Sequence, residues 1–239
     1  MAAKTICIWG RNGCGKTVLA LNLAAWLAQN QMLVGLISAG DFAEIPAYLG
    51  LSFPVDKGMK AAKDMPTEHI KNFYVEALRD NSLYLLSPPP DCDSFDMCGF
   101  DKAFGRRVIQ ESKETFDVVV VDCTTNKENA ITGEAIAFSD AVIVPVDDNI
   151  AYPEWYHSNL RIFDNIKVKT YFVESKYNGY TNIQSLLKSM GVEAITSMQY
   201  IKSAPGSTNE GTFIYKGGRE QKINEQALNT IWGAITSGK

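Results

Sequence analysis

Net charge and the metal-binding residues histidine and cysteine are scarce in this sequence. Its 239 residues include two histidines and five cysteines, and the formal net charge is −4. The cysteines lack the paired spacing of zinc sites, which argues against a structural metal centre. A weakly acidic chain also lacks the concentrated positive field that coating of nucleic acid requires. Binding of nucleic acid is therefore possible but is not indicated by the charge. The basic cluster within residues 102–113 is interpreted as a solvated helix face.

Long apolar runs are missing as well. No stretch approaches the roughly 18 apolar residues that a membrane-spanning helix requires. The amino terminus leads into a short apolar strand and lacks the basic segment and cleavage site of a secretory signal. An odd number of cysteines without a disulfide pattern suits a reducing compartment. We therefore expect a cytoplasmic protein with no transmembrane segment.

Short apolar runs alternate with amphipathic stretches along the whole chain, of which 46% is hydrophobic and 21% charged. Continuous Val/Ile runs indicate strands that are covered on both faces, as in a parallel sheet. Helices between such strands predict an α/β three-layer sandwich with a mostly parallel central sheet, folded as a single domain over residues 1–239. The expected strands are 4–9, 32–37, 82–87, 117–122, 141–146, 168–173 and 192–198. The expected helices include 15–30, 41–50, 67–80 and 220–235.

The segment GRNGCGKT, residues 10–17, fits the pattern G-x-x-x-x-G-K-[ST] without a mismatch. It follows an apolar strand and opens a helix, so loop amides and the helix amino terminus converge on phosphate oxygens. This context disfavours a chance glycine turn. Lys16 would neutralise phosphate charge, and the Thr17 hydroxyl would bind Mg²⁺. The predicted phosphate contacts are Gly10, Arg11, Asn12, Gly13, Cys14, Gly15, Lys16, Thr17 and Val18.

A phosphate loop of this kind needs an acid that acts on magnesium, usually at the end of a neighbouring apolar strand. Asp122 closes the run FDVVVVD and is the candidate, which makes Thr17 and Asp122 the predicted metal ligands. The alternative is that Asp122 is a turn or helix-capping residue.

These features resemble the MinD/ParA family of P-loop ATPases. The resemblance is carried by the loop, most specifically, and by ALNLAAWLA, SLYLLSPPP, FDVVVVDCTTN and SDAVIVPVDDN, over about two thirds of the chain. It implies ATP and Mg²⁺ as cofactors, an ATP-dependent homodimer and a protein partner or cargo. It also implies a switch that positions or partitions a cellular structure, such as pilus machinery, a division site or a plasmid or chromosome.

In that family a second lysine follows the first glycine of the loop and reaches across the dimer to the partner's phosphates. This chain has Arg11 there. Arginine keeps the charge and adds a planar fork suited to phosphate, so the role across a dimer is physically feasible. The alternative is a loop arginine that acts within its own chain or not at all.

The sequence departs from the family where hydrolysis is concerned. The second strand of relatives ends in D-x-D, whereas this chain has Ser38-Ala39-Gly40 followed by Asp41. Asp41 could position the attacking water if the loop is shifted, but its spacing to Glu44 favours a helix cap in a capping box. The predicted catalytic set is therefore Lys16, Arg11, Asp41 and Asp122, with slow or absent ATP hydrolysis. The segment VESKYNG also lacks the family's early asparagine for the base and offers Asn178 only later.

The last helix places Leu228, Ile231, Trp232 and Ile235 on one face, with Asn224 on the other. Packing on the sheet is favoured over peripheral membrane contact, because the polar face lacks the basic residues that anionic lipid attracts. Two other functions are kept in view: a small-molecule kinase or ligase whose substrate is held by residues 92–100, and an ATP-binding scaffold that never hydrolyses.

Overall fold

The computed structural model describes residues 2–77, 82–90, 92–93, 99–177, 183–200 and 219–237. Within them eight strands form one sheet in the order β3-β4-β2-β5-β1-β6-β7-β8. Every described pairing is parallel except that of β3 with β4. The strands are β1 (Lys4–Ile8), β2 (Val34–Ser38), β3 (Val75–Glu76), β4 (Leu83–Leu86), β5 (Val118–Asp122), β6 (Ala141–Val146), β7 (Thr170–Tyr177) and β8 (Ala194–Gln199).

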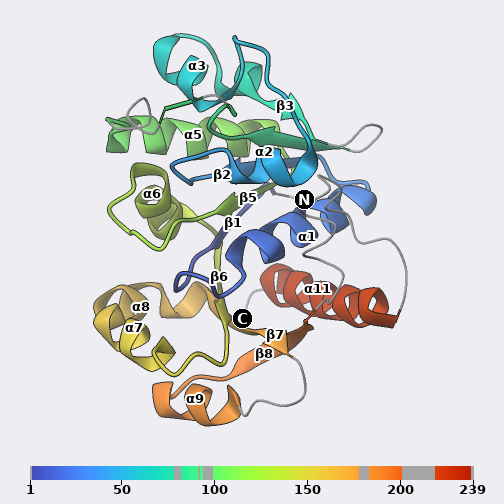
Figure 1. Cartoon of the computed structure of the whole chain (residues 1–239), viewed down its shortest axis with the longest axis vertical. Helices are drawn as coiled ribbons and strands as arrows, with labels where there is room; N and C mark the ends of the chain where they lie inside the picture. The colour runs from blue at the N-terminus through green and yellow to red at the C-terminus, as the bar shows by residue number, and fades with distance from the viewer. Residues whose placement is uncertain are drawn as a thin grey trace.

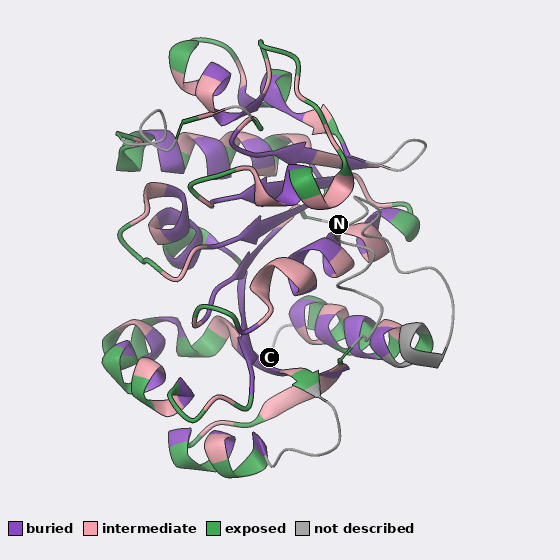
Figure 2. Cartoon of the chain, viewed as in Figure 1, coloured by how far each residue is buried: buried purple, intermediate pink, exposed green. Residues whose placement is uncertain are grey.

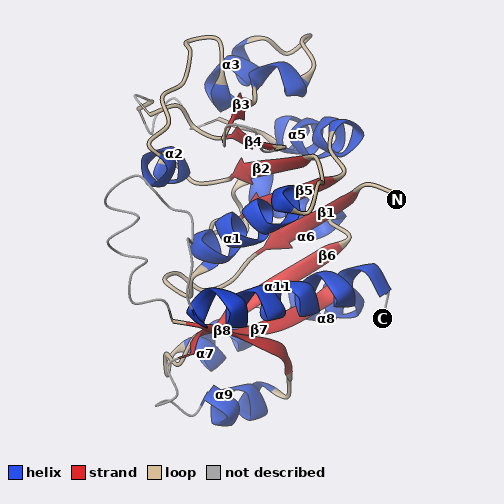
Figure 3. Ribbon diagram, turned by 90° about the vertical axis from the view of Figure 1, so that its right-hand side faces the viewer, coloured by secondary structure: helices blue, strands red, loops and turns tan. Residues whose placement is uncertain are grey.

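Helices cover both faces of this sheet (Figures 1 and 3). One core packs the sheet against α1 (Lys16–Gln29), α2 (Glu44–Leu49) and α11 (Arg219–Ser237). The other core lies under α3 (Gly58–Asp64), α5 (Lys102–Thr115), α6 (Ala130–Phe138), α7 (Tyr152–Ser158), α8 (Leu160–Ile166) and α9 (Ile183–Met190), with the 3-10 helices η1 (Ile70–Phe73) and η2 (Lys167–Lys169) beside them. The predicted three-layer α/β sandwich with a mostly parallel sheet is confirmed.

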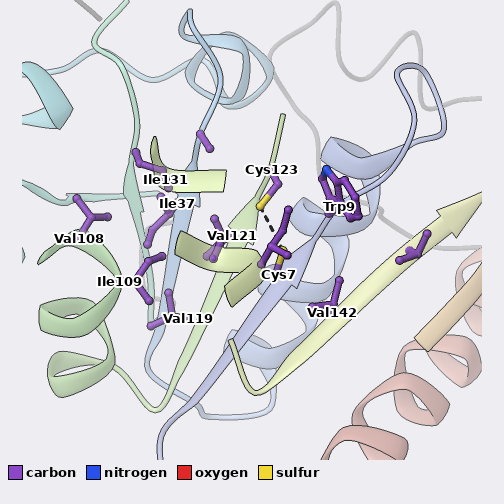
Figure 4. Close-up of a cluster of buried hydrophobic side chains, with 14 of the residues drawn as sticks. Cys7, Trp9, Ile37, Val108, Ile109, Val119, Val121, Cys123, Ile131 and Val142 are labelled. Atoms are coloured by element: carbon purple, nitrogen blue, oxygen red, sulfur yellow. Dashed lines mark hydrogen bonds between the residues drawn. The ribbon is translucent and has the colours of Figure 1, made fainter. Parts of the chain in front are cut away.

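The central strands are buried on both faces, which Figure 2 shows as a continuous buried sheet between the helices. Every residue of β2, β5 and β6 is buried. Each fully buried valine contributes about 1.5–3 kcal/mol relative to an exposed one, so the run VVVVD secures the middle of the sheet. Behind its carboxyl end the thiols of Cys7 and Cys123 lie 3.4 Å apart in the core (Figure 4).

The predicted helix over 67–80 is wrong in its described part. The chain forms η1 and then β3, an antiparallel edge strand. Ile70 and Phe73 are buried under α5, where the Ile70 N–H donates to Glu111 at 2.7 Å and the Tyr74 hydroxyl bonds Ser112 at 2.7 Å. These tertiary contacts outweigh the local helical spacing. Helix α3, just before this segment, had no counterpart among the expected elements.

The basic face of α5 is solvated at Lys102 and Arg106, as predicted, but several of its charges are also paired. Arg106 pairs with Glu134 at 3.0 Å, Arg107 with Glu111 at 3.1 Å, and Lys113 with Asp140 at 2.8 Å. Arg107 also donates to the Ala62 carbonyl at 3.0 Å and to the Glu68 carbonyl. The charges therefore fasten α5 to neighbouring segments instead of presenting a positive surface.

The last helix packs on the sheet, as predicted. Leu228, Ile231 and Ile235 are buried in the core beside α1. Asn224 is a correction, because it is buried and clamps the backbone of Gln199 in β8, accepting from its N–H at 2.8 Å and donating to its carbonyl at 3.4 Å. Across the described ranges, no helix has the length and apolarity to cross a membrane.

Candidate functional site

A pocket of about 890 Å³ opens at the carboxyl ends of the parallel strands. Ligands of parallel α/β sheets bind at this edge, because the loops after the strands converge there. Among the predicted site residues, Asn12, Gly13, Gly15, Lys16, Thr17, Val18, Asp41 and Asp122 line the pocket. Gly10, Arg11 and Cys14 are not part of its wall.

The loop between β1 and α1 depends on its glycines. Gly13 and Gly15 have φ values of 79° and 94°, the left-handed region in which a side chain is disfavoured. A Cβ on Gly15 would also lie 2.7 Å from the Ser175 hydroxyl, and one on Gly10 would lie 2.9 Å from the Cys14 sulfur. The loop therefore needs glycine at 13 and 15 for its backbone conformation, and at 10 and 15 because a Cβ would clash with neighbouring side chains.

Lys16 is held over the loop by two acceptors. Its ammonium donates to the Arg11 carbonyl at 3.1 Å and to the Thr125 hydroxyl at 3.2 Å. Thr125 in turn donates to the Gly10 carbonyl at 3.1 Å. Thr125 was not among the predicted site residues, although its place three positions after Asp122 in the run DCTTN was a usable signal.

Asp122 is buried, with 7% of its surface exposed. Burial raises the pKa of its carboxyl to about 7, against the opposing effects of a hydrogen bond from Thr17 and the charge of Lys16. Its Oδ1 atom has no hydrogen-bond partner among the described residues. Leaving such an acceptor unpaired costs about 1–3 kcal/mol, so a ligand that binds this oxygen would stabilise the folded protein.

The donor set around Asp122 fits Mg²⁺. A carboxylate oxygen beside the Thr17 hydroxyl is the hard oxygen environment that this ion prefers. No group of three or more His, Cys, Asp or Glu gathers to hold an ion in the described parts of the chain. A magnesium ion here would therefore take its other ligands from phosphate and water, as is usual at nucleotide sites.

Cys14 is a packing residue of the loop. Its side chain is buried, and burial raises the pKa of the thiol to about 11. A thiol with so high a pKa carries almost no thiolate at neutral pH and is a poor nucleophile.

Arg11 does not line the pocket of its own chain. Its Nη1 atom donates to the Asn12 carbonyl at 3.1 Å and lies 4.0 Å from Asp147 Oδ2. A quarter of the side chain is exposed. The predicted residues Lys16, Thr17 and Asp122 are thus brought together, whereas Arg11 is set apart from them.

The end of β2 differs from the prediction. Helix α2 begins at Glu44 with Ala43 as its cap and no side-chain cap bond, so the capping box of Asp41 and Glu44 is wrong. Asp41 is exposed in the loop before the helix and lines the pocket. Glu44 also lines it and accepts a hydrogen bond from Tyr48 at 2.6 Å.

Lys176 is a second cation at the loop that sequence reasoning missed. Its ammonium donates to the Gly13 carbonyl, and its backbone has a φ of 57°. A non-glycine residue in this left-handed region costs about 1–3 kcal/mol and occurs where surrounding structure enforces it. No rule of composition or spacing signals such a conformation at a lysine.

No protein-family model matches the chain, and no curated protein matches its sequence. Solved structures match it in three dimensions. A ParA family ATPase from Chlorobium tepidum has a TM-score of 0.81 at 12% identity, covering 95% of this chain and 99% of that one.

Two MinD structures are similarly close. MinD from Pyrococcus horikoshii, complexed with Mg-ADP, has a TM-score of 0.79 at 16% identity, covering 96% of both chains. The MinC:MinD cell division protein complex of Aquifex aeolicus gives 0.77 at 18% identity, covering 97% of this chain and 96% of that one. The chain has the fold of the MinD and ParA ATPases.

Proposed function

We propose that the chain binds ATP with Mg²⁺ in this pocket, as a single nucleotide-binding domain. The observation that carries the proposal is the pairing of the loop at β1–α1 with Asp122. Lys16 sits over the loop, Thr17 is hydrogen-bonded to the Asp122 carboxyl, and Oδ1 of that carboxyl has no partner among the described residues. Loop amides and Lys16 would hold the phosphates, while Thr17 and Asp122 would hold Mg²⁺, which draws phosphate charge onto itself.

The bound nucleotide would control assembly. A homodimer that forms with ATP and separates with ADP needs a contact that senses the γ-phosphate. Arg11 suits that role because it does not line its own pocket, and its guanidinium is held by a 3.1 Å hydrogen bond to the adjacent Asn12 carbonyl and a long 4.0 Å ion pair with Asp147. Its guanidinium would leave Asp147 for the phosphates of the partner, which offer a stronger charge-assisted contact.

The dimer would act in positioning or partitioning a cellular structure, through a protein partner or cargo. This part of the proposal draws on the fold shared with MinD and ParA ATPases, including the MinD that is bound to MinC in the Aquifex structure. Mg-ADP in the Pyrococcus structure supports the choice of cofactors in the same way.

Turnover of ATP would be slow or absent. Asp41 is the nearest replacement for the second acid of D-x-D, but it lies exposed in the loop before α2. Ser38 and Gly40 line the pocket where the family resemblance places acids. A scaffold that binds ATP without hydrolysing it is thus the second candidate function.

Solution mass tests the proposal. Light scattering should give a dimer with ATP·Mg²⁺ and a monomer with ADP·Mg²⁺. Arg11→Ala should stay monomeric with ATP, whereas Arg161→Ala, an exposed arginine on α8, should dimerise like the parent. If the solution mass is the same with ATP and with ADP, the proposed switch is wrong. If Arg11→Ala forms a dimer with ATP, the proposed role of Arg11 across the dimer is wrong.

A further inference from the structure

Lys176 lies at an irregular step of β7. Pairing with β6 runs regularly to Glu174, but the register with β8 shifts between Glu174 and Tyr177. Lys176 takes its left-handed φ of 57° within this step. Irregular steps of this kind re-aim side chains next to functional sites. Glu174 anchors the strand just before it, since its carboxylate accepts from Gln184 at 2.6 Å and from Ser197.

The step brings two consecutive side chains to the same loop. In a regular strand Ser175 and Lys176 would point to opposite faces of the sheet. Instead, the Ser175 hydroxyl and the Lys176 Cε atom lie 2.7 Å and 3.8 Å from the Cβ position of Gly15. The Lys176 ammonium continues to the Gly13 carbonyl. Both side chains line the pocket.

The two lysines act on the loop from the pocket side. Burial raises the pKa of Cys14 to about 11, and the charges of Lys16 and Lys176 both oppose that rise. Arg11 does not line the pocket, and its Nη1 atom lies 4.0 Å from Asp147 Oδ2. The loop is therefore flanked by two cations inside the pocket and one outside it.

We propose that Lys176 is a second phosphate-binding residue, contacting the same polyphosphate as Lys16 from within one chain. An ammonium has three donor protons, and its bond to Gly13 uses one of them. The left-handed backbone conformation of Lys176 directs its side chain to the loop at Gly13. The inference rests on the proposed nucleotide binding and deepens it, because a cation supplied in cis lets a single chain bind ATP before any dimer forms.

Calorimetric titration with ATP·Mg²⁺ tests this at a protein concentration where light scattering gives the monomer mass. Lys176→Met should raise the Kd for ATP at least about tenfold, the loss of one charge-assisted contact. Lys176→Arg should recover most of the affinity. Lys188→Met, an exposed lysine on α9, is the matched control and should bind like the parent.

Lys176→Gly guards against a folding artefact, because glycine adopts φ of 57° without strain and lacks the cation. It should bind as weakly as Lys176→Met while melting no lower than the parent. A parent that binds ATP and a Lys176→Met variant of equal affinity would overturn the role of Lys176 alone. A parent that binds no ATP would overturn the proposed function, and this inference with it.

Discussion

The ends of β5 and β2 lie side by side in the sheet yet are equipped very differently. Asp122 and Ser38 are register partners. On β5 a buried carboxylate keeps one oxygen unpartnered, at a cost in stability that a ligand would offset. At the end of β2 stands Ser38, and the loop that follows carries Gly40 and an exposed Asp41. The proposed binding of a metal–nucleotide and the activation of water thus depend on different strand ends, and the residues present fit the first more fully than the second.

Asp122→Asn breaks the β5 half of the comparison and should have the largest effect. The carboxyl ionises near pH 4 in the unfolded chain and near pH 7 in the folded one. Between these values the folded state holds the extra proton, so the parent loses stability as pH rises from about 4 to 7. Asparagine does not titrate, so the variant should be more stable than the parent at pH 8, by about 2–4 kcal/mol without nucleotide.

Thermal unfolding of both proteins at pH 5 and pH 8 measures this effect. Asp56→Asn, on an exposed loop, is the control and should follow the parent. Asp122→Asn should also lose Mg²⁺-dependent ATP binding, so its added stability comes with lost function. Parallel pH profiles for parent and variant would show that burial does not shift Asp122 as argued.

Gly40→Asp tests the end of β2 by restoring an acid in the loop that follows this strand. A Cβ on Gly40 meets nothing closer than the Phe42 carbonyl at 3.5 Å, so a side chain fits. An acid restored beside the pocket should raise ATP turnover about tenfold, worth about 1.4 kcal/mol of transition-state stabilisation. Phosphate release is the measurement, and Gly233→Asp on the exposed side of α11 is the control. Fast ATP turnover by the parent would instead show that Asp41 already positions the attacking water.

Tyr48→Phe probes Glu44, the first residue of α2 after β2, and should have the smallest effect. Removing the hydroxyl deletes the 2.6 Å hydrogen bond to Glu44. The expected loss of stability is about 1 kcal/mol, measured by urea unfolding, with no change in ATP affinity. A marked fall in turnover of the Gly40→Asp protein on adding Tyr48→Phe would show that Glu44 also faces the attacking water.

The sequence predicts the centre of this molecule better than its margins. Runs such as VVVVD and AVIVPV are continuously apolar, which is typical of strands buried on both faces of a parallel sheet. The phosphate-loop pattern predicts a strand before it and a helix after it, and β1 and α1 are found there. Asp122 follows from its position after such a run. These features depend on residues near one another in the chain.

Margins are decided by distant contacts. Ile70, Phe73 and Tyr74 have helical spacing but are drawn under α5, so η1 and an edge strand replace the predicted helix. Asp41 has the spacing of a cap, yet α2 begins only at Glu44. Lys176 depends on a register shift against β8, which no local pattern encodes.

β1 is synthesised before every other strand of the sheet and depends most on segments that come later. Its neighbours are β5 and β6, and Cys7 meets Cys123 at 116 positions along the chain. At about 5–20 residues per second, the nascent strand waits roughly ten seconds for a partner on the ribosome. Until then β1 lacks both of its neighbouring strands. Apolar segments that are exposed during synthesis are bound by chaperones. The phosphate-loop segment between β1 and α1 can therefore reach its final shape only after β5 and β6 have been synthesised.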